Sequence, residues 1–179
     1  MERPPNGEGN EESQYSYWIM MEHPGWVVLN RGVNGQRSDE ILRRFQRDVL
    51  GESPGYVIIL GGVNDIYQGR DVESIRGNLE GMYKMAVESK ILPVSCTVLP
   101  YNTMTSKAAN NRRILNTWIR DHADKNGLPF CDTSEAVASA QNPDRLEGTP
   151  DGLHPDVRGY KKMGEALASV IEANKAAIS

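Results

Sequence analysis

Residues 55–60 read Gly-Tyr-Val-Ile-Ile-Leu, and two glycines, a valine, Asn64 and Asp65 follow this apolar run directly. A run that is apolar throughout, rather than at alternate positions, predicts a strand buried on both faces. Other short apolar runs of this kind lie at residues 26–30, 91–99 and 128–133. The chain is therefore expected to build a buried sheet, with polar residues standing at the end of one strand.

Amphipathic segments separate the predicted strands. Ser38 is a suitable N-cap for the first of them, and Pro155 suits the first turn of the last. Strands that alternate with helices predict an α/β fold, whose parallel sheet is covered by helices on both faces. Ligands of such sheets bind beyond the carboxyl ends of the strands, which is where Asn64 and Asp65 fall. The apolar spacing predicts helices at residues 38–50, 72–89, 105–125 and 155–173.

Composition and charge limit the partners of the chain. Its length predicts one domain over residues 1–179, with residues 1–13 as a loop. A net charge of −4 argues against a nucleic-acid partner, and no apolar run approaches a membrane span. The first residues lack the pattern of a signal peptide, and Cys96 and Cys131 lie in strand-like runs without a Cys-X-X-Cys motif. We expect two reduced, buried thiols rather than a disulfide, and a cytoplasmic protein.

One of the three histidines stands in a loop with a nearby acid. His154 lies in Asp-Gly-Leu-His-Pro-Asp, three residues after Asp151. This spacing lets the carboxylate accept a hydrogen bond from Nδ1, so that Nε2 is left to take a proton. The alternative is an Asp-Gly turn with an incidental histidine before a proline-started helix. His23 and His122 are expected at the surface or in supporting positions.

Two further loops carry groups suited to an oxyanion. Gly35 precedes the start of a helix, where backbone N–H groups favour developing negative charge. Asn64 carries a neutral amide that donates a hydrogen bond without bringing a counter-charge. Each loop alone is weak evidence, but both are expected at the same edge of the sheet as His154.

These three loops together resemble a known family. Gly35 in Asn-Arg-Gly-Val-Asn-Gly-Gln, Gly-Val-Asn-Asp at 62–65 and Asp-Gly-Leu-His-Pro at 151–155 look like blocks II, III and V of the SGNH, or GDSL, hydrolases. The resemblance covers nearly the whole chain. It implies a flavodoxin-like three-layer α/β/α fold with a parallel sheet. It also implies cleavage of esters and thioesters through a Ser-His-Asp arrangement, without a metal or other cofactor.

The resemblance also implies a role for each matching residue. The N–H of Gly35 and the side chain of Asn64 would donate to the oxyanion. His154 would be the general base, and Asp151 would orient it. Asp65 is expected to hold the turn rather than to touch the substrate.

The first block of the family, Gly-Asp-Ser, has no counterpart before Gly35, so no nucleophile is identified. Gly-Glu-Ser at 51–53 precedes a predicted strand, which places Ser53 roughly 20 Å from the candidate site. Ser13 and Ser16 stand where the family has a loop and helix, and Ser38 fits a helix cap better. We expect that the chain begins about a dozen residues late and lacks the first strand.

The absent strand would be central in the family's strand order, 2-1-3-4-5. Unpaired backbone groups would then lower stability, or a segment swapped from another copy in a homo-oligomer would repair the gap. The expected function is hydrolysis of a carboxylic ester, impaired in this chain. The ester could be an acyl ester, a lysophospholipid, a thioester or an acetylated sugar.

Two alternatives to a working hydrolase are considered. The first is a non-catalytic binding module for a sugar ester or acyl ligand, which would keep the pocket without the nucleophile. The second is a flavodoxin-like nucleotide or flavin binder. It is disfavoured, because the sequence shows no phosphate-cradling glycine loop of the required spacing.

Overall fold

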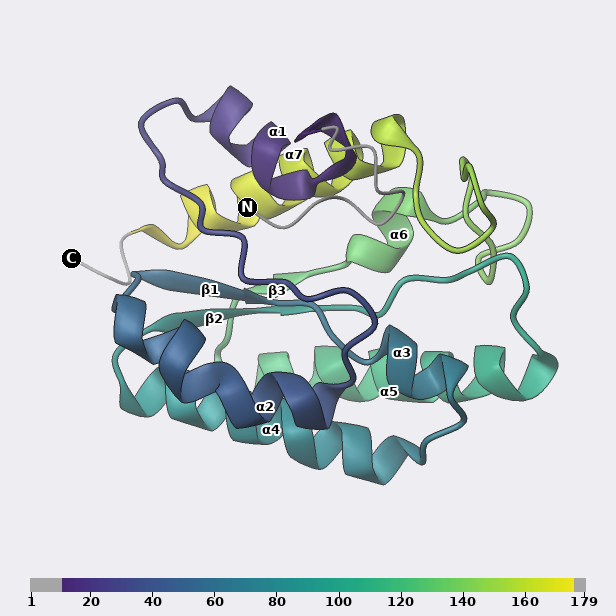
Figure 1. Ribbon diagram of the computed structural model, residues 1–179, viewed down its shortest axis with the longest axis horizontal. Coiled ribbons are helices and arrows are strands. Elements are labelled where there is room, and N and C mark those ends of the chain that lie inside the picture. The colour runs from purple at the N-terminus through teal and green to yellow at the C-terminus, as the bar shows by residue number, and fades with distance from the viewer. Residues whose placement is uncertain (1–10, 176–179) are drawn as a thin grey trace.

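The computed structural model describes residues 11–175. Its centre is a parallel sheet in the order β1-β2-β3, with helices on both faces (Figure 1). The strands are β1 (Tyr56–Ile59), β2 (Leu92–Cys96) and β3 (Phe130–Cys131). Tyr56 pairs with Leu92 and Ser95 pairs with Phe130. The three-layer, flavodoxin-like architecture expected from the sequence is confirmed, although β2 and β3 are shorter than the apolar runs that predicted them.

The helices divide into two layers (Figure 1). On one face lie the 3-10 turn η1 and three helices, of which α1 packs along α7. On the other face α2, α4 and α5 pack side by side, and α3 connects β1 to this layer. The first layer contains η1 (Glu11–Ser13), α1 (Tyr15–Glu22), α6 (Thr133–Val137) and α7 (Val157–Ala173). The second contains α2 (Ser38–Asp48), α3 (Val63–Tyr67), α4 (Val72–Glu88) and α5 (Ser106–Asn126), and the 3-10 turn η2 (Leu50–Glu52) leads into β1.

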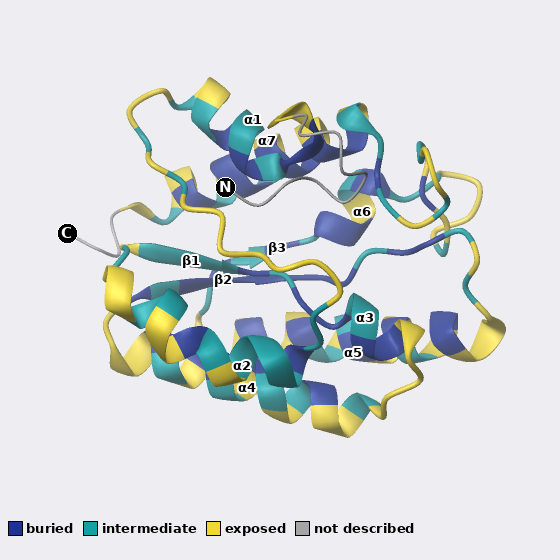
Figure 2. Ribbon diagram, viewed as in Figure 1, coloured by how far each residue is buried: buried dark blue, intermediate teal, exposed yellow. Residues whose placement is uncertain are grey.

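The core lies on both sides of the sheet, as the buried faces of the helices in Figure 2 show. Beneath the sheet, α4 and α5 contribute fully buried side chains such as Leu79 and Leu115. Above it, Ile19 of α1 and Leu167 of α7 pack against Val94 of β2. Burial of these side chains is the main stabilising contribution to the fold.

Local signals place the long helices close to where the sequence predicts them. Asp71, Thr105 and Asp156 accept hydrogen bonds from the first turns of α4, α5 and α7 as N-caps. The last helix begins at Val157 rather than at Pro155. Ser38 is not the N-cap of α2, because Arg37 holds that position and Ser38 is the first helical residue.

The predicted strand at residues 26–30 is not a strand in the structure. Within the described residues, Val27, Val28 and Leu29 form no backbone hydrogen bond, and β1 pairs with β2 alone. Alternate side chains still follow the strand pattern, because Val28 packs against the core whereas Val27 is 84% exposed. The apolar pattern is present, but a strand also needs a hydrogen-bonding neighbour, and none lies beside this segment among residues 11–175.

The cysteines are found as the sequence predicts. Cys96 and Cys131 are free and buried in neighbouring strands. Burial raises the pKa of the Cys131 thiol to about 12. Of the helices in the described part of the chain, none combines the length and the apolar character that crossing a membrane requires.

Candidate active site

Gly62 brings the chain from β1 into the candidate site. As the N-cap of α3 it has a φ of 110°, in the left-handed region that side chains rarely adopt. A Cβ at this position would also lie 3.3 Å from three core side chains. Helix α3 can therefore start directly after the strand, and Asn64 and Asp65 stand in its first turn at the carboxyl edge of the sheet.

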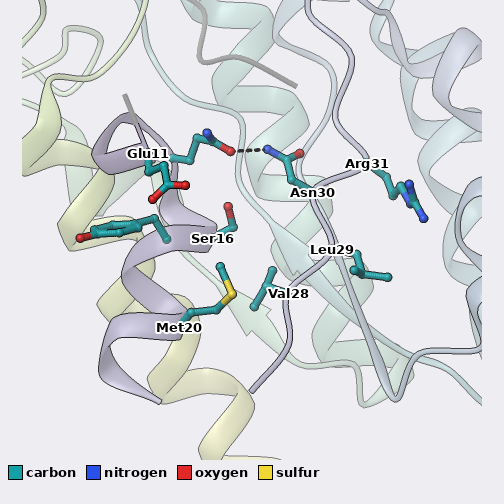
Figure 3. A pocket seen from close by; sticks show the side chains of 9 residues that line it. Glu11, Ser16, Met20, Val28, Leu29, Asn30 and Arg31 are labelled. Atoms are coloured by element: carbon teal, nitrogen blue, oxygen red, sulfur yellow. Dashed lines mark hydrogen bonds between the residues drawn. The ribbon is translucent and has the colours of Figure 1, made fainter. Parts of the chain in front are cut away.

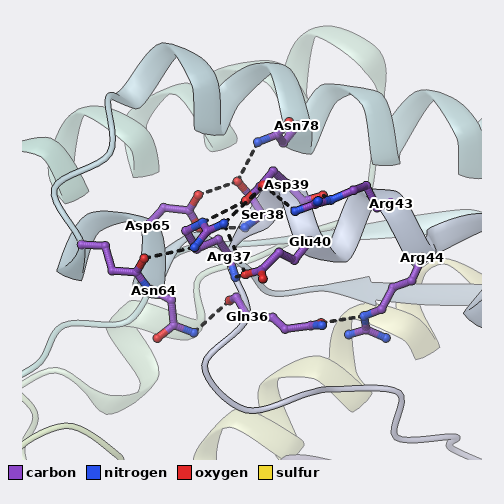
Figure 4. A network of polar contacts seen from close by, with 11 residues as sticks. Gln36, Arg37, Ser38, Asp39, Glu40, Arg43, Arg44, Asn64, Asp65 and Asn78 are labelled. Atoms are coloured by element: carbon purple, nitrogen blue, oxygen red, sulfur yellow. Dashed lines mark hydrogen bonds and ion pairs between the residues drawn. The ribbon is translucent and has the colours of Figure 1, made fainter.

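Asn64 faces the loop that precedes α2 (Figure 4). Its Nδ2 donates a hydrogen bond to the carbonyl oxygen of Gln36 over 2.9 Å. Gly35 beside it has a φ of 78°. Its N–H makes no backbone hydrogen bond within the described residues. Because the amide of Asn64 has a second hydrogen, both it and Gly35 can donate to a ligand. Asn64 and Gly35 are therefore connected through Gln36, which follows Gly35 in the chain and accepts the hydrogen bond from Asn64.

Asp65 points away from solvent, toward the start of α2 (Figure 4), and is 3% exposed. Its Oδ2 accepts from the N–H of Ser38 over 2.8 Å, and its Oδ1 accepts from the Ser38 hydroxyl over 2.7 Å. Asn78 of α4 donates to the same hydroxyl over 2.9 Å. Ser38 does not act as a cap, because the buried carboxylate of Asp65 takes this role across 27 residues of sequence.

Asp151 and His154 meet in the loop before α7. Nδ1 of His154 lies 2.6 Å from Oδ2 of Asp151, and Oδ1 accepts from the N–H groups of Leu153 and His154, each over 2.8 Å. Partial burial alone would raise the pKa of Asp151. The hydrogen bonds from the ring and from these N–H groups outweigh that effect and lower the pKa to about 2. The ionised carboxylate keeps a proton on Nδ1, so Nε2 is the nitrogen that can accept one.

The loop after β2 connects the His154 loop to the rest of the sheet edge. The N–H of Asn102 donates to the carbonyl oxygen of Gly152 over 2.7 Å. The side-chain oxygen of Asn102 accepts from the N–H of Leu146 over 2.8 Å. Asn102 thus holds two neighbouring loops in place. From the sequence it can be recognised only as a polar residue beyond the end of a strand.

Two tyrosines complete the connection to Asn64. The ring of Tyr101 packs edge-on against that of Tyr67, with the ring centroids 5.6 Å apart. Tyr67 stands one helical turn after Asn64 and is 60% exposed. Within residues 11–175, Asn64 and His154 share no direct hydrogen bond. Tyr67 cannot be identified from the sequence, because the five residues of α3 are too few to show a helical face.

No serine in the described residues is hydrogen-bonded to the ring of His154. The hydroxyl of Ser38 is fully buried and donates to the carboxylate in α3. Ser53 precedes β1, whereas the candidate site follows that strand. Ser13 and Ser16 stand in η1 and α1, and each is 7% exposed. The residues expected to act as base, orienting acid and oxyanion donors are therefore all present in the structure, and no described serine lies in a position to act with them.

An apolar groove of about 240 Å³ lies elsewhere, between α1 and residues 28–31 (Figure 3). Tyr17, Met20 and Val28 are among the residues that line it, and none of the candidate site residues is. No cluster of His, Cys, Asp or Glu side chains that could hold a metal ion is present in residues 11–175.

Solved structures share this architecture over nearly the whole chain. A protein assigned to the lipolytic G-D-S-L family of Desulfitobacterium hafniense DCB-2 superposes with a TM-score of 0.80 at 28% identity, covering 91% of each chain. A GDSL-like lipase of Bacteroides thetaiotaomicron VPI-5482 superposes with a TM-score of 0.76 at 26% identity, covering 97% of this chain and 92% of the lipase.

Curated relatives are more distant or only partly covered. An N-acylneuraminate cytidylyltransferase of Streptococcus agalactiae is 32% identical over 95 residues, which are 52% of this chain but only 22% of that protein. An acetylxylan esterase of Geobacillus stearothermophilus is 23% identical over 157 residues, which are 80% of this chain and 71% of the esterase. The GDSL-like Lipase/Acylhydrolase family model matches residues 5–162, and the chain therefore belongs to this family.

Proposed function

We propose that this chain carries the base and the oxyanion donors of a serine hydrolase that cleaves carboxylic esters. The observation that carries the proposal is the Asp151–His154 pair, which stands at the sheet edge that also presents Gly35 and Asn64. His154 takes a proton at Nε2 from the attacking hydroxyl, and Asp151 stabilises the resulting imidazolium. The N–H of Gly35 and the amide of Asn64 bind the oxyanion.

The ester belongs to the classes that the family resemblance implies: acyl esters, lysophospholipids, thioesters or acetylated sugars. Similarity to an acetylxylan esterase supports a short acyl group on a sugar. The exposed ring of Tyr67, one turn from Asn64, offers a flat apolar surface beside the oxyanion donors for the alcohol part of such an ester. The two free thiols support a reducing compartment, so a cytoplasmic location is part of the proposal.

The nucleophile is proposed to come from a strand that pairs with the free edge of β1 and ends in Gly-Asp-Ser. Support comes from the sheet, because β1 pairs with β2 on one side only among the described residues. A parallel strand on the other side would end at the same edge as β1, which leads into Asn64. A serine at its end would therefore arrive at the edge where the oxyanion donors lie.

Labelling with a fluorophosphonate tests both parts of the proposal. The reagent is applied to this chain and to an extended chain, in which an apolar strand ending in Gly-Asp-Ser is fused ahead of Met1. We expect no His154-dependent label on this chain. On the extended chain we expect a label at the added serine that is lost in His154→Ala. Coding DNA upstream of Met1 that encodes such a strand in frame would support the same conclusion.

The second candidate function is a non-catalytic binding module for a sugar ester or acyl ligand. It is favoured by the observation that no described serine reaches the His154 ring. A folded extended chain that binds p-nitrophenyl acetate but neither hydrolyses it nor takes the fluorophosphonate label would support this candidate over the hydrolase.

A further inference from the structure

The loop that carries Asp151 and His154 is joined to the rest of the fold by few polar contacts. Within residues 11–175, one hydrogen bond connects residues 149–155 to another part of the chain, and the N–H of Asn102 donates it to the carbonyl oxygen of Gly152 over 2.7 Å. The other hydrogen bonds of residues 149–155 stay inside the loop. The side chains of Asp151 and His154 are 40% and 39% exposed, so packing restrains them only in part. The contact with Asn102 therefore fixes where the loop lies.

The side chain of Asn102 holds the peptide group that makes this contact. Its Oδ1 accepts from the N–H of Leu146 over 2.8 Å. Leu146 is 4% exposed, and its neighbours Arg145 and Glu147 form backbone hydrogen bonds with residues 137–139 over 2.8 and 2.9 Å. Asn102 is thus tied to a part of the fold that has backbone partners on both sides of the contact. The loop after β2 and the loop before α7 lie together at one end of the sheet (Figure 1).

The residue before Asn102 connects the same segment to the oxyanion donors. Tyr101 is 5% exposed, and its ring meets the ring of Tyr67 with the centroids 5.6 Å apart. Tyr67 stands in α3, one helical turn after Asn64. Residues 101 and 102 therefore form a bridge. On one side lies the helix that carries Asn64, and on the other lies the loop that carries His154.

We propose that Asn102 is a positioning residue, which sets where Nε2 of His154 stands relative to the amide of Asn64. The inference rests on the proposed function, because ester hydrolysis needs the base and the oxyanion donor at a fixed separation. The contact of Asp151 with His154 does not need Asn102, since its hydrogen bonds lie within the loop. Loss of the Asn102 side chain should therefore displace an intact pair rather than break it. A misplacement of about 1 Å at a catalytic group can lower a rate about a hundredfold.

Two variants of similar size separate the hydrogen bond of Asn102 from the shape of its side chain. Asn102→Leu removes the acceptor for the N–H of Leu146, and Asn102→Asp keeps an acceptor there. Asn116→Leu is the matched control. Asn116 of α5 accepts from the N–H of Val98 over 2.7 Å and makes no hydrogen bond to residues 149–155 among the described residues. Both leucine variants leave a backbone N–H without its partner, so both should lose some stability.

The first test is NMR spectroscopy of the chain without added residues, and it does not depend on hydrolysis. Relaxation of ¹⁵N reports the order of the Gly152 and His154 amides, and carboxyl ¹³C shifts report the pKa of Asp151. We expect both amides to become more mobile in Asn102→Leu. They should stay as ordered as in the unmodified chain in Asn102→Asp and Asn116→Leu. The pKa of Asp151 should remain at about 2 in both leucine variants, because the pair itself is intact.

The second test measures hydrolysis of p-nitrophenyl acetate by the extended chain. In Asn102→Leu the kcat should fall about ten- to a hundredfold with little change in KM, because alignment is lost and binding is not. Asn102→Asp should recover most of the kcat, and Asn116→Leu should keep it. Rates are measured well below the melting temperature of each variant, so that a loss of stability does not enter the comparison.

Three results would overturn the role of Asn102 and leave the proposed function intact. The kcat could be unchanged in Asn102→Leu, or it could fall equally in Asn116→Leu. The Gly152 and His154 amides could stay as ordered in Asn102→Leu as in the unmodified chain. The pKa of Asp151 could rise in Asn102→Leu, which would mean that the pair is broken rather than displaced. A folded extended chain that hydrolyses no ester would instead contradict the proposed function, and this role with it.

Discussion

The side-chain amide of Asn64 donates a hydrogen bond to the carbonyl oxygen of Gln36 over 2.9 Å, and this bond joins α3 to the loop that precedes α2. The first prediction concerns this amide in the extended chain. Asn64→Ala should lower the rate of p-nitrophenyl acetate hydrolysis about a hundred- to a thousandfold, because an oxyanion donor is lost. Its free energy of unfolding should fall by only about 1 kcal/mol.

Asn78→Ala is the control for Asn64. It removes a side-chain amide that donates to Ser38 on the far side of the same network. We expect a loss of stability with little change in the rate. Equal losses of rate in the two variants would contradict the assignment of Asn64 as an oxyanion donor.

The second prediction compares two serines that each donate two hydrogen bonds to an aspartate, one buried and one exposed; the hydroxyl of Ser38 also accepts from Asn78. Ser38 donates through its N–H and hydroxyl to Asp65, and Ser74 donates in the same way to Asp71 at the exposed start of α4. Ser38→Ala leaves the buried carboxylate one donor short and should cost about 1–3 kcal/mol. Ser74→Ala should cost less than about 1 kcal/mol, because water replaces the lost donor. Urea unfolding measures the loss of unfolding free energy in both variants, and equal losses would contradict the idea that the buried contacts of Ser38 with Asp65 and Asn78 stabilise the fold more than an exposed cap does.

The third prediction separates two costs of replacing a glycine by alanine: backbone strain at a positive φ, and contacts between the new Cβ and its neighbours. Both are measured as losses of unfolding free energy. Gly62→Ala should cost about 3 kcal/mol or more, because a left-handed backbone and contacts at 3.3 Å both oppose a side chain. Gly69 has a φ of 73° with nothing within 4 Å of a Cβ, so Gly69→Ala should cost about 1–2 kcal/mol. Gly77 lies inside α4 with open space around it, and Gly77→Ala should be neutral or stabilising. A different order of the three unfolding free energies would contradict this account.

The fourth prediction concerns pH. The pKa of Asp151 lies at about 2 in the fold, below its ordinary value of 3.8. A lowered pKa means that the contact with His154 stabilises the fold fully above 3.8 and is lost as the pH falls toward 2. Carboxyl ¹³C NMR should show this low midpoint. In His154→Ala the midpoint should move up toward the ordinary value, and an unchanged midpoint would contradict the pairing.

Elements with strong local signals are predictable from this sequence. The repeat of apolar residues gives α4 and α5 within one residue at each end, and the structure adds Asp71 and Thr105 as their N-caps. The apolar run before Asn64 gives β1, and the spacing of Asp151 and His154 gives a contact within a single turn. These features depend on residues that are close together along the chain.

Features that depend on a distant partner are not predictable in this way. Residues 26–30 have the composition of a strand, but pairing is decided by a neighbour that the described chain does not supply. Ser38 has the side chain of an N-cap, yet it is the first residue of α2, and the distant carboxylate of Asp65 accepts its N–H. Tyr67 meets Tyr101 only because α3 and the loop after β2 converge in the fold.

The most direct measurement of the central claim is fluorophosphonate labelling of the extended chain, followed by peptide mapping, with and without His154→Ala. The account predicts one label, at the serine of the added Gly-Asp-Ser, which is lost when His154 is replaced. A folded extended chain that takes no label would contradict the claim that Asp151, His154, Gly35 and Asn64 form the site of an ester hydrolase.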